Sequence, residues 1–386
     1  MYYKIFHISV LLILHTALLS GQVKVRLLTG LDPESVIFSV IAGEYEIISP
    51  AGKTAVVKKG EPGIISGSNG KLIVKTRNSP GFYSDSVSFS GMTGNDSFSL
   101  RTSAQDPLRQ IYSGDLKCMP DLGTLLLINT CDIETYIAGV VQAEGGSGKN
   151  PEYFRTQAVI ARTYMYRYFD KHMSDGYNLC DNTHCQAFKG IAGDSVINNA
   201  AIDTRGLVIL GPDSTLIISA FHSNCGGETS PSEDVWLNGQ SYLKKVRDTH
   251  CMSSRNARWR KSLIIGDWIG YLGKAGLPAA PDNLSLLNFS QFTRLNEYRV
   301  DTFSMPLRQI RTDLDLRSTW FSVKIEGDSV ILNGRGYGHG VGLCQEGAMA
   351  MAEKGSDYNQ IISYYYKGVI ISDINNAVVA KSPMSP

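Results

Sequence analysis

Two hydrophobic periodicities follow one another along this chain of 386 residues. Up to about residue 115, apolar and polar residues alternate in short runs separated by turn residues, a pattern typical of β-strands. After residue 125, apolar residues recur three and four positions apart, which is typical of amphipathic helices. The chain is therefore predicted to be α+β, with a β-rich N-terminal region followed by a mixed α/β domain. Strands are predicted at residues 23–28, 36–42, 45–49, 54–58, 71–76, 86–90 and 125–129.

The first residues of the chain are typical of a secretory signal peptide. Lys4 precedes an apolar stretch at residues 5–19, and Ser20 and Gly21 follow it. A membrane anchor is the alternative, but the stretch is shorter than the roughly 20 residues that span a bilayer. We expect cleavage here, which leaves an exported protein without a transmembrane segment. The predicted divisions are a signal peptide at 1–21, a β-rich region at 22–115, a mixed α/β domain at 116–375 and a tail at 376–386.

Composition and charge exclude two classes of protein. Hydrophobic residues make up 43% of the chain, charged residues 19%, and the formal net charge is +1. A chain of this kind is not a disordered polyelectrolyte, and it has no bulk electrostatic attraction to nucleic acid. We therefore expect no nucleic-acid partner, and specific ligands must be recognised by local sites.

One carboxylate lies at the end of an apolar helical stripe. Asp132 is a candidate N-cap for this helix, and Glu144 continues the stripe four residues after Val140. Partial burial there would favour the protonated form of the carboxyl group, which a general acid needs. The alternative is that the helix ends after Val141 and leaves Glu144 in solvent.

A second helix is predicted to begin at Pro151, with Asn150 as its N-cap. Arg162 lies beside the apolar stripe of this helix, one turn after Ala158. Its side chain could reach inward to a carboxylate or a substrate oxygen. The alternative is a surface arginine whose aliphatic stem lies along the apolar face.

The chain has seven cysteines, so at least one thiol is outside any intramolecular disulfide. Cys180 and Cys185 are spaced as in the loops of structural zinc sites, and His172 and His184 are available as nitrogen ligands. The spacing alone does not fix the set of ligands.

A second group contains His222, Cys225, His250 and Cys251. It allows either a metal site or a disulfide between its two cysteines, and the disulfide is favoured in an exported protein. This pairing would leave Cys344 as the single thiol.

Two further cysteines, Cys118 and Cys131, flank a predicted hairpin that turns at residues 121–123. That turn would not place the two cysteines opposite each other. They are therefore left unassigned.

Near the C-terminus, glycine occupies alternate positions from Gly334 to Gly342, and a helix is predicted to follow at residues 344–352. Such a strand lacks side chains on one face, which lets an extended ligand or another backbone approach closely. Tyr337, His339 and Gln345 would then offer stacking and hydrogen bonds beside it. Close packing against a neighbouring strand of the same protein is the alternative.

Four ordered segments together resemble the stage II sporulation protein D family, whose SpoIID/LytB-type domain acts on peptidoglycan. They are YIAGVVQAE followed by RTQAVIARTYMY, then CQAFKG, then HSNCGGETS with VWLNGQSYLKKVRD, and finally GRGYGHGVGLCQEGAMAMAEKG with YYYKG. The resemblance covers about residues 110–370.

This resemblance implies a mixed α/β catalytic domain with a substrate cleft and lytic transglycosylase activity. Such an enzyme cleaves the MurNAc-GlcNAc bond of peptidoglycan glycan strands, preferentially denuded ones, and leaves 1,6-anhydro-MurNAc ends. The resemblance places the general acid/base at Glu144 and a functional arginine at Arg162. It also implies a zinc ion near the active site, held by Cys180, Cys185 and His172.

The matched segments also supply candidates for substrate binding, namely Gln186, Ser223, Trp236, Tyr337, His339 and Gln345. The chain departs from the usual pattern at Gly145-Gly146, which replace a Met-Pro type ending, and at Cys344, where serine is common. We expect the protein in the periplasm or cell envelope. The enhancer branch of the family provides an alternative function, a non-catalytic glycan-binding module that enhances a cell-wall amidase.

Overall fold

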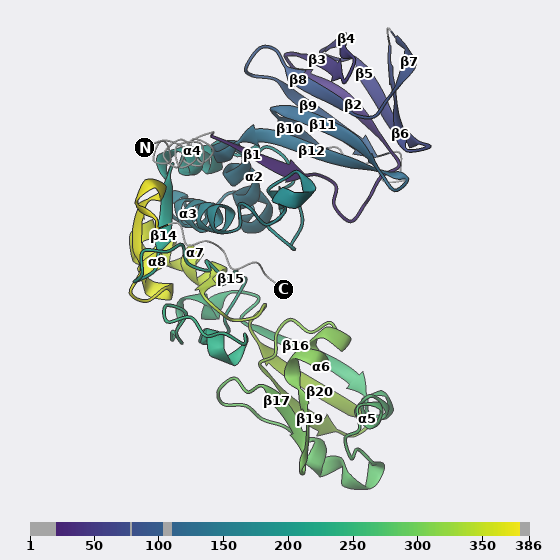
Figure 1. The fold of residues 1–386 in the computed structure, drawn as a ribbon. Coiled ribbons are helices and arrows are strands. Elements are labelled where there is room, and N and C mark those ends of the chain that lie inside the picture. Colours follow the sequence, from purple (N-terminus) through teal and green to yellow (C-terminus); the bar gives the residue numbers. More distant parts are fainter. Residues whose placement is uncertain (1–20, 78, 103–109, 379–386) are drawn as a thin grey trace, which may run out of the picture. The chain divides into compact units, whose positions relative to one another are not determined.

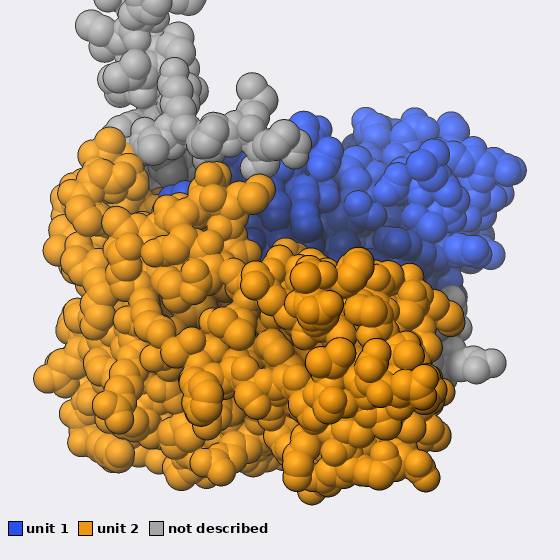
Figure 2. Space-filling view, turned by 90° about the horizontal axis from the view of Figure 1, so that it is seen from below, with its two compact units in different colours: residues 1–148, 164–205 blue, residues 149–163, 206–386 orange. Residues whose placement is uncertain are grey.

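The computed structural model describes residues 21–77, 79–102 and 110–378 (Figure 1). Figure 2 shows its two compact units in separate colours. Unit 1 comprises residues 1–148 and 164–205, and unit 2 comprises residues 149–163 and 206–386. The signal peptide predicted at residues 1–21 lies outside the described residues except for Gly21, and the tail is described only to residue 378. The other domain limits predicted from the sequence remain predictions.

The described part of unit 1 contains a seven-stranded sheet in the order β13-β1-β12-β11-β8-β3-β4 and a six-stranded sheet in the order β10-β9-β2-β5-β6-β7. All their pairings are antiparallel except that of β1 with β13. The strands are β1 (Gln22–Arg26), β2 (Ser35–Ala42), β3 (Glu44–Ser49), β4 (Gly52–Lys58), β5 (Pro62–Ser68), β6 (Lys71–Thr76), β7 (Ser79–Ser84), β8 (Val87–Gly91), β9 (Ser97–Thr102), β10 (Gln110–Ser113), β11 (Asp115–Asp121), β12 (Thr124–Asp132) and β13 (Leu179–Cys180).

An aromatic core joins the two sheets. Phe38 of β2 stacks on Phe89 of β8 with 4.2 Å between ring centroids, and on Phe98 of β9 at 5.0 Å. All three rings are fully buried. Because β2 and β8 belong to different sheets, these contacts pack the sheets face to face, as in a β-sandwich. The strands predicted in this region are confirmed as β1, β2, β3, β4, β6 and β8.

The hairpin between β11 and β12 is also confirmed. Asp121 pairs with Thr124, and the two residues between them, Leu122 and Gly123, have positive φ angles of 47° and 93°. This is the backbone of a type I′ turn, which suits the twist of a hairpin. Cys118 pairs with Leu127, so it does not face Cys131, as the turn predicts.

Helices follow this hairpin directly. The helix α2 (Ile133–Gly145) begins after Asp132, whose side chain accepts a hydrogen bond of 3.0 Å from the backbone N–H of Thr135. It lies against α4 (Ser195–Asp203), and the 3-10 helix η1 (Met173–Asp175) also belongs to unit 1. The helix α3 (Pro151–Arg167) contributes residues to both units. At its start, Asn150 Oδ1 accepts the N–H of Glu152 at 2.9 Å, which confirms the predicted cap.

Unit 2 contains short paired strands and two helices around the predicted motifs. The strand β14 (Leu207–Leu210) pairs with β22 (Ile370–Asp373), and β15 (Phe221–His222) pairs in parallel with β21 (Leu343–Cys344). The helices are α7 (Gln345–Glu353) and α8 (Tyr358–Tyr365), and the 3-10 helices are η2 (Ser232–Asp234), η3 (His250–Ser253) and η5 (Ile374–Asn376).

Residues 258–335 of unit 2 build a separate small core. The strand β20 (Ser329–Arg335) lies between β16 (Arg258–Ile264) and β19 (Phe321–Glu326). Trp268, Tyr298 and Leu332 are fully or almost fully buried in this core. The other elements here are α5 (Ile265–Lys274), α6 (Leu307–Asp313), η4 (Pro281–Leu287) and the hairpin of β17 (Glu297–Val300) with β18 (Phe303–Pro306).

The predicted α+β class is confirmed, with a β-rich N-terminal region followed by mixed helices and strands. Over the described ranges, none of the helices combines the length and apolarity needed to cross a bilayer.

Candidate functional site

Glu144 lies in the last turn of α2. The helix continues to Gly145 instead of ending after Val141, so the fraying alternative is wrong. Gly146 ends the helix with a φ of 74°, a conformation that glycine adopts readily. The Glu144 side chain is half-buried, and its Oε1 accepts a hydrogen bond of 3.0 Å from the backbone N–H of Ala187. The end of α2 is thereby joined to the loop formed by residues 185–190.

This loop packs closely on α2. The ring of Phe188 lies 5.0 Å from that of Tyr136, and a Cβ atom at Gly139 would lie 2.3 Å from Gly190 O. Tyr136 also donates a hydrogen bond of 3.3 Å from its hydroxyl group to Gln186 Oε1. Gln186 is only 4% exposed. The helix therefore positions two of the predicted site residues, Glu144 and Gln186, through one loop.

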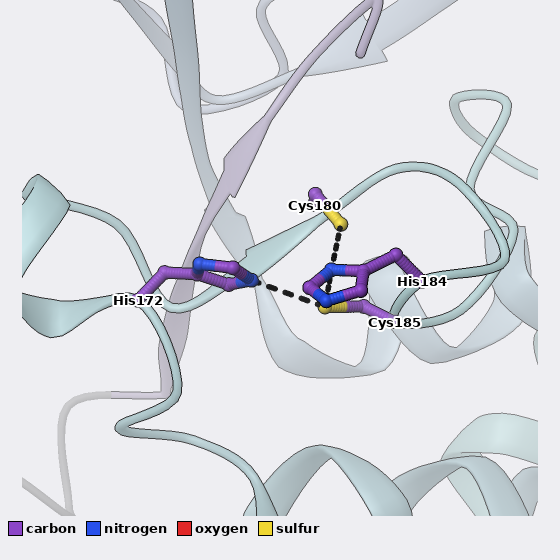
Figure 3. A group of neighbouring side chains, drawn as sticks. All are labelled: His172, Cys180, His184 and Cys185. Atoms are coloured by element: carbon purple, nitrogen blue, oxygen red, sulfur yellow. Dashed lines mark hydrogen bonds between the residues drawn. The ribbon is translucent and has the colours of Figure 1, made fainter. Parts of the chain in front are cut away.

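A cluster of four metal-ligating side chains lies at the start of the same loop (Figure 3). It is formed by His172 after α3, Cys180 of β13, and His184 and Cys185 in the following loop. The distance is 3.5 Å from Cys185 Sγ to His172 Nε2 and from Cys180 Sγ to His184 Nδ1, and 3.9 Å from Cys185 Sγ to His184 Nδ1. We call these four residues the His172 cluster.

The geometry of the His172 cluster fits a tetrahedral ion. Zinc holds sulfur at about 2.3 Å and nitrogen at about 2.0–2.1 Å, so neighbouring ligand atoms lie about 3.6 Å apart. Hydrogen bonds with Cys185 and His184 hold the pKa of Cys180 below its ordinary value. This favours the thiolate, which is the form that binds metals. The structure places His184, which the sequence analysis named as an available nitrogen ligand, beside the three residues of the predicted ligand set.

Arg162 belongs to the part of α3 that lies in unit 2. Its side chain is 0% exposed, and its Nη1 donates a hydrogen bond of 3.2 Å to the backbone oxygen of Leu207. The alternative of a surface arginine is therefore wrong. Thr163, the next residue, accepts the N–H of Ile209 at 2.9 Å, so α3 is tied to β14 at two successive positions.

Two predicted motifs, far apart in the sequence, meet in unit 2. The parallel pairing of β15 with β21 places His222 beside Cys344, and the backbone oxygen of Ser223 accepts the N–H of Glu346 at 3.0 Å. Gln345 is the first residue of α7 and is buried. Ser223 and Gln345, both predicted to bind substrate, thus lie on adjoining segments.

The alternating glycines pack against the protein itself. A Cβ atom at Gly336 would lie 2.6 Å from Asn224 O, one at Gly338 2.8 Å from His222 Cβ, and one at Gly342 2.1 Å from Ala220 O. Each of these three glycines also has a positive φ. The interpretation of an open glycine floor for a ligand is therefore wrong, and close packing between segments is the reason for the pattern.

His339 is held by backbone groups at both ring nitrogens. Nε2 donates to Phe221 O at 2.9 Å, and Nδ1 accepts the N–H of Val341 at 3.1 Å. Burial, reinforced by nearby arginine charges, lowers the pKa of His339 to about 4, so its ring is neutral at pH 7. The Trp236 ring lies 6.3 Å from it. Tyr337 is 44% exposed, with the Arg317 guanidinium 5.9 Å from its ring.

The predicted site residues are thus distributed over both units. Unit 1 contains Glu144, Gln186 and the His172 cluster, and unit 2 contains the remaining ones, Arg162, Ser223, Trp236, Tyr337, His339 and Gln345.

Known proteins match this chain over more than half of its length. Stage II sporulation protein D of Bacillus subtilis is 28% identical over 262 residues, which cover 64% of this chain and 76% of that protein. An uncharacterized protein of Brachyspira hyodysenteriae is 29% identical over 269 residues, which cover 68% of this chain and 73% of that protein. The amidase enhancer of Bacillus subtilis is 27% identical over 289 residues, and this chain covers 40% of its length.

The model of the SpoIID family, described as stage II sporulation protein, matches residues 121–210. This segment contains Glu144, Arg162 and the His172 cluster. The resemblance expected from the motifs is confirmed: residues 121–210 match the stage II sporulation protein D family model, and the chain is similar to a protein of that name over 64% of its length.

Proposed function

We propose that the protein is an exported lytic transglycosylase of the cell envelope. Its substrate is the MurNAc-GlcNAc bond in denuded peptidoglycan glycan strands, and its products carry 1,6-anhydro-MurNAc ends. The observation that carries the proposal is the placement of Glu144, half-buried at the end of α2 with one carboxylate oxygen held by the N–H of Ala187. Names of relatives that refer to sporulation and to the enhancement of an amidase support an envelope role.

One carboxyl group is sufficient for this chemistry. The 6-hydroxyl of the muramic acid unit is the internal nucleophile, so no water molecule has to be activated. Glu144 protonates the glycosidic oxygen as general acid, and its carboxylate then accepts the proton of the 6-hydroxyl. Hydrolytic glycosidases instead generally need two carboxyl groups at a fixed separation. The hydrogen bond from Ala187 supports this role because it fixes the orientation of the carboxyl group.

The remaining site residues have different proposed roles. Trp236 and Tyr337 stack on sugar faces, and Gln186, Ser223 and Gln345 are hydrogen-bonding candidates. Both ring nitrogens of His339 already bind backbone groups, so its proposed role is to support the neighbouring ring of Trp236. Arg162 is a positioning residue that holds α3 against Leu207 of β14, because its fully buried side chain does not touch a glycan strand.

The His172 cluster is the proposed zinc site of this protein. Two sulfur and two nitrogen donors are a common ligand set for structural zinc. A bound zinc ion would fix the loop that donates from Ala187 to Glu144, because Cys185 precedes Ala187 by two positions. The catalytic proton transfers are assigned to Glu144 alone.

A second candidate function is the stimulation of a cell-wall amidase through glycan binding without cleavage. It is favoured by the match to a relative named amidase enhancer. The replacement of the Met-Pro type ending after Glu144 by Gly145-Gly146 also favours it.

One assay separates the two functions. The purified protein is incubated with denuded glycan strands, and mass spectrometry searches for 1,6-anhydro-MurNAc ends while a co-sedimentation assay measures binding. We expect such ends with the wild type, a loss of at least about 100-fold in rate for Glu144→Gln, and unchanged binding. The matched control is Glu353→Gln, an exposed glutamate on α7, which should cleave as the wild type does.

The two negative outcomes have different meanings. Binding without anhydro ends in the wild type would contradict the enzymatic function and favour the amidase enhancer. Undiminished formation of anhydro ends by Glu144→Gln would contradict the assignment of Glu144 and leave the activity in place.

A further inference from the structure

We propose that Cys225, Asp248, Cys251 and Cys344 form a second metal centre in unit 2, suited to a thiophilic divalent cation such as zinc. One donor atom from each residue lies within 4.8 Å of all the others, and all four residues are buried. Cys225 Sγ is 3.4 Å from Cys251 Sγ and 3.3 Å from Asp248 Oδ2. We call these residues the Cys225 cluster.

These distances are close to those of a tetrahedral site with three sulfur ligands and one oxygen ligand. Zinc binds sulfur at about 2.3 Å and carboxylate oxygen at about 2.0–2.2 Å, which separates two sulfur ligands by about 3.8 Å and a sulfur from an oxygen by about 3.5 Å. Small shifts of the side chains bring the Cys225 cluster to these values.

Secondary-structure elements hold the Cys225 cluster together. Cys344 is the last residue of β21 and pairs with His222 of β15. Cys225 lies three residues after His222. Cys251 belongs to η3, which packs against α7, the helix that follows Cys344. The ligands are therefore preorganised by pairing and packing, as a structural metal site requires.

The carboxylate of Asp248 lacks a cationic partner. Asp248 is 0% exposed, and no lysine, arginine or histidine side chain ion-pairs with it within the part of the chain that the structure describes. Its oxygens accept hydrogen bonds of 2.9 Å from the hydroxyl of Tyr365 and from the N–H of His250. A buried carboxylate is costly without a compensating cation, and a divalent ion between the four ligands would supply one.

The surroundings of the sulfur atoms suit thiolates. The backbone N–H groups of Cys225 and Gly347 point at Cys344 Sγ, with N···S distances of 3.3 and 3.4 Å. Arg294 donates to the backbone oxygen of Cys225 at 2.6 Å, while its buried Nε and Nη1 have no hydrogen-bond partner among the described residues. An ion with three thiolates and one carboxylate would carry a net charge of about −2, which these donors and the Arg294 guanidinium would partly offset.

A disulfide between Cys225 and Cys251 is the competing arrangement. The disulfide would use two of the three sulfur atoms and leave the third, that of Cys344, outside the bond. The buried carboxylate of Asp248 would then have no positive charge to balance it. A metal ion engages all four groups, and for this reason the observations favour it. On binding, each thiol ligand releases its proton to solvent, so occupancy should fall at low pH.

Metal content and sulfur coordination test the proposal on the full chain. The purified protein is loaded with zinc and weighed by native mass spectrometry. A variant with Cys180→Ser and Cys185→Ser, which lacks the sulfur ligands of the His172 cluster, should keep one zinc ion. X-ray absorption at the zinc edge should then show about three Zn–S bonds near 2.3 Å and one shorter Zn–O bond.

Single variants locate the ion in the Cys225 cluster. Adding Cys344→Ser to the double variant should remove the remaining zinc, while adding Cys118→Ser, a buried cysteine outside both clusters, should not. If the Cys344→Ser protein does not fold, two measurements still test the second metal centre. They are the X-ray absorption spectrum of the double variant and the number of zinc ions bound by the wild type. Absence of zinc from the double variant, or a Cys225–Cys251 disulfide seen as a loss of two hydrogens in mass, would overturn the proposal.

Discussion

The backbone N–H of Ala187 lies 3.0 Å from Oε1 of Glu144 and donates a hydrogen bond to it. This bond connects the end of α2 with a loop that begins at Cys185 of the His172 cluster. The geometry of the proposed catalytic carboxyl group therefore depends on how closely the loop packs on the helix.

Gly139 controls this packing. A Cβ atom there would lie 2.3 Å from Gly190 O and 2.6 Å from the Phe188 ring, so Gly139→Ala must displace the loop. We expect a loss of about 1–3 kcal/mol in the free energy of unfolding and a lower rate of glycan cleavage. Gly193→Ala is the matched control, because a Cβ atom meets nothing within 4 Å there. Wild-type stability and rate in Gly139→Ala would show that the loop position does not depend on this contact.

Metal removal tests the His172 cluster. A structural ion that binds only the folded protein stabilises it by about 2.7 kcal/mol when its free concentration is 100 times its dissociation constant. A chelator should therefore lower the melting temperature of the wild type by several degrees. The variant with Cys180→Ser and Cys185→Ser should start from a lower melting temperature and respond less. An equal response in both proteins would place the stabilising ion elsewhere.

Arg162 should contribute to stability through its buried hydrogen bond. Its guanidinium donates to Leu207 O, and its side chain is 0% exposed. We expect Arg162→Met to lower the free energy of unfolding by about 1.5–3 kcal/mol, because a hydrogen bond to a charged group is lost. Urea unfolding measures the change, and the exposed Arg205→Met should stay within about 0.5 kcal/mol of the wild type. A change in the free energy of unfolding as small as this in Arg162→Met would contradict a stabilising role for the buried hydrogen bond.

Asp96 gives the β-rich region a defined pH dependence. Its carboxylate accepts hydrogen bonds from the N–H groups of Thr93 at 2.7 Å, Gly94 at 2.8 Å and Glu44 at 3.0 Å. Burial opposes the charged form, but a hydrogen bond of 2.7 Å from the Thr93 hydroxyl and these three backbone hydrogen bonds outweigh it and hold the pKa of Asp96 below its ordinary value. A lowered pKa means that the stabilisation is complete above about pH 3.9 and is lost as the pH falls below that value.

Asp96→Asn should therefore lower the free energy of unfolding by about 1–3 kcal/mol at pH 7. The difference from the wild type should shrink as the pH falls, because protonation removes the same interaction from the wild type. Urea titrations at successively lower pH values measure it, with the exposed Asp85→Asn as control. A difference that stays constant with pH would mean that the charge of Asp96 is not what stabilises the region.

Local signals in the sequence were sufficient for many elements. Alternating apolar residues located most strands of unit 1, and Asp132 and Asn150 located the beginnings of α2 and α3. The strands β5, β7, β9 and β10 were not predicted. In β5, Pro62, Gly63 and Gly67 weaken the strand signal, and pairing with β2 and β6 compensates for it.

The sequence by itself determined the α+β class, the caps and the family resemblance, because these depend on short segments. Only the tertiary structure decided which distant residues share a cluster. Pairing of β15 with β21 brings Cys344 to Cys225, whereas the sequence left Cys344 as a single thiol. The same packing explains the alternating glycines, which a ligand could equally have required. Contacts of this kind join segments more than a hundred residues apart, and no local periodicity records them.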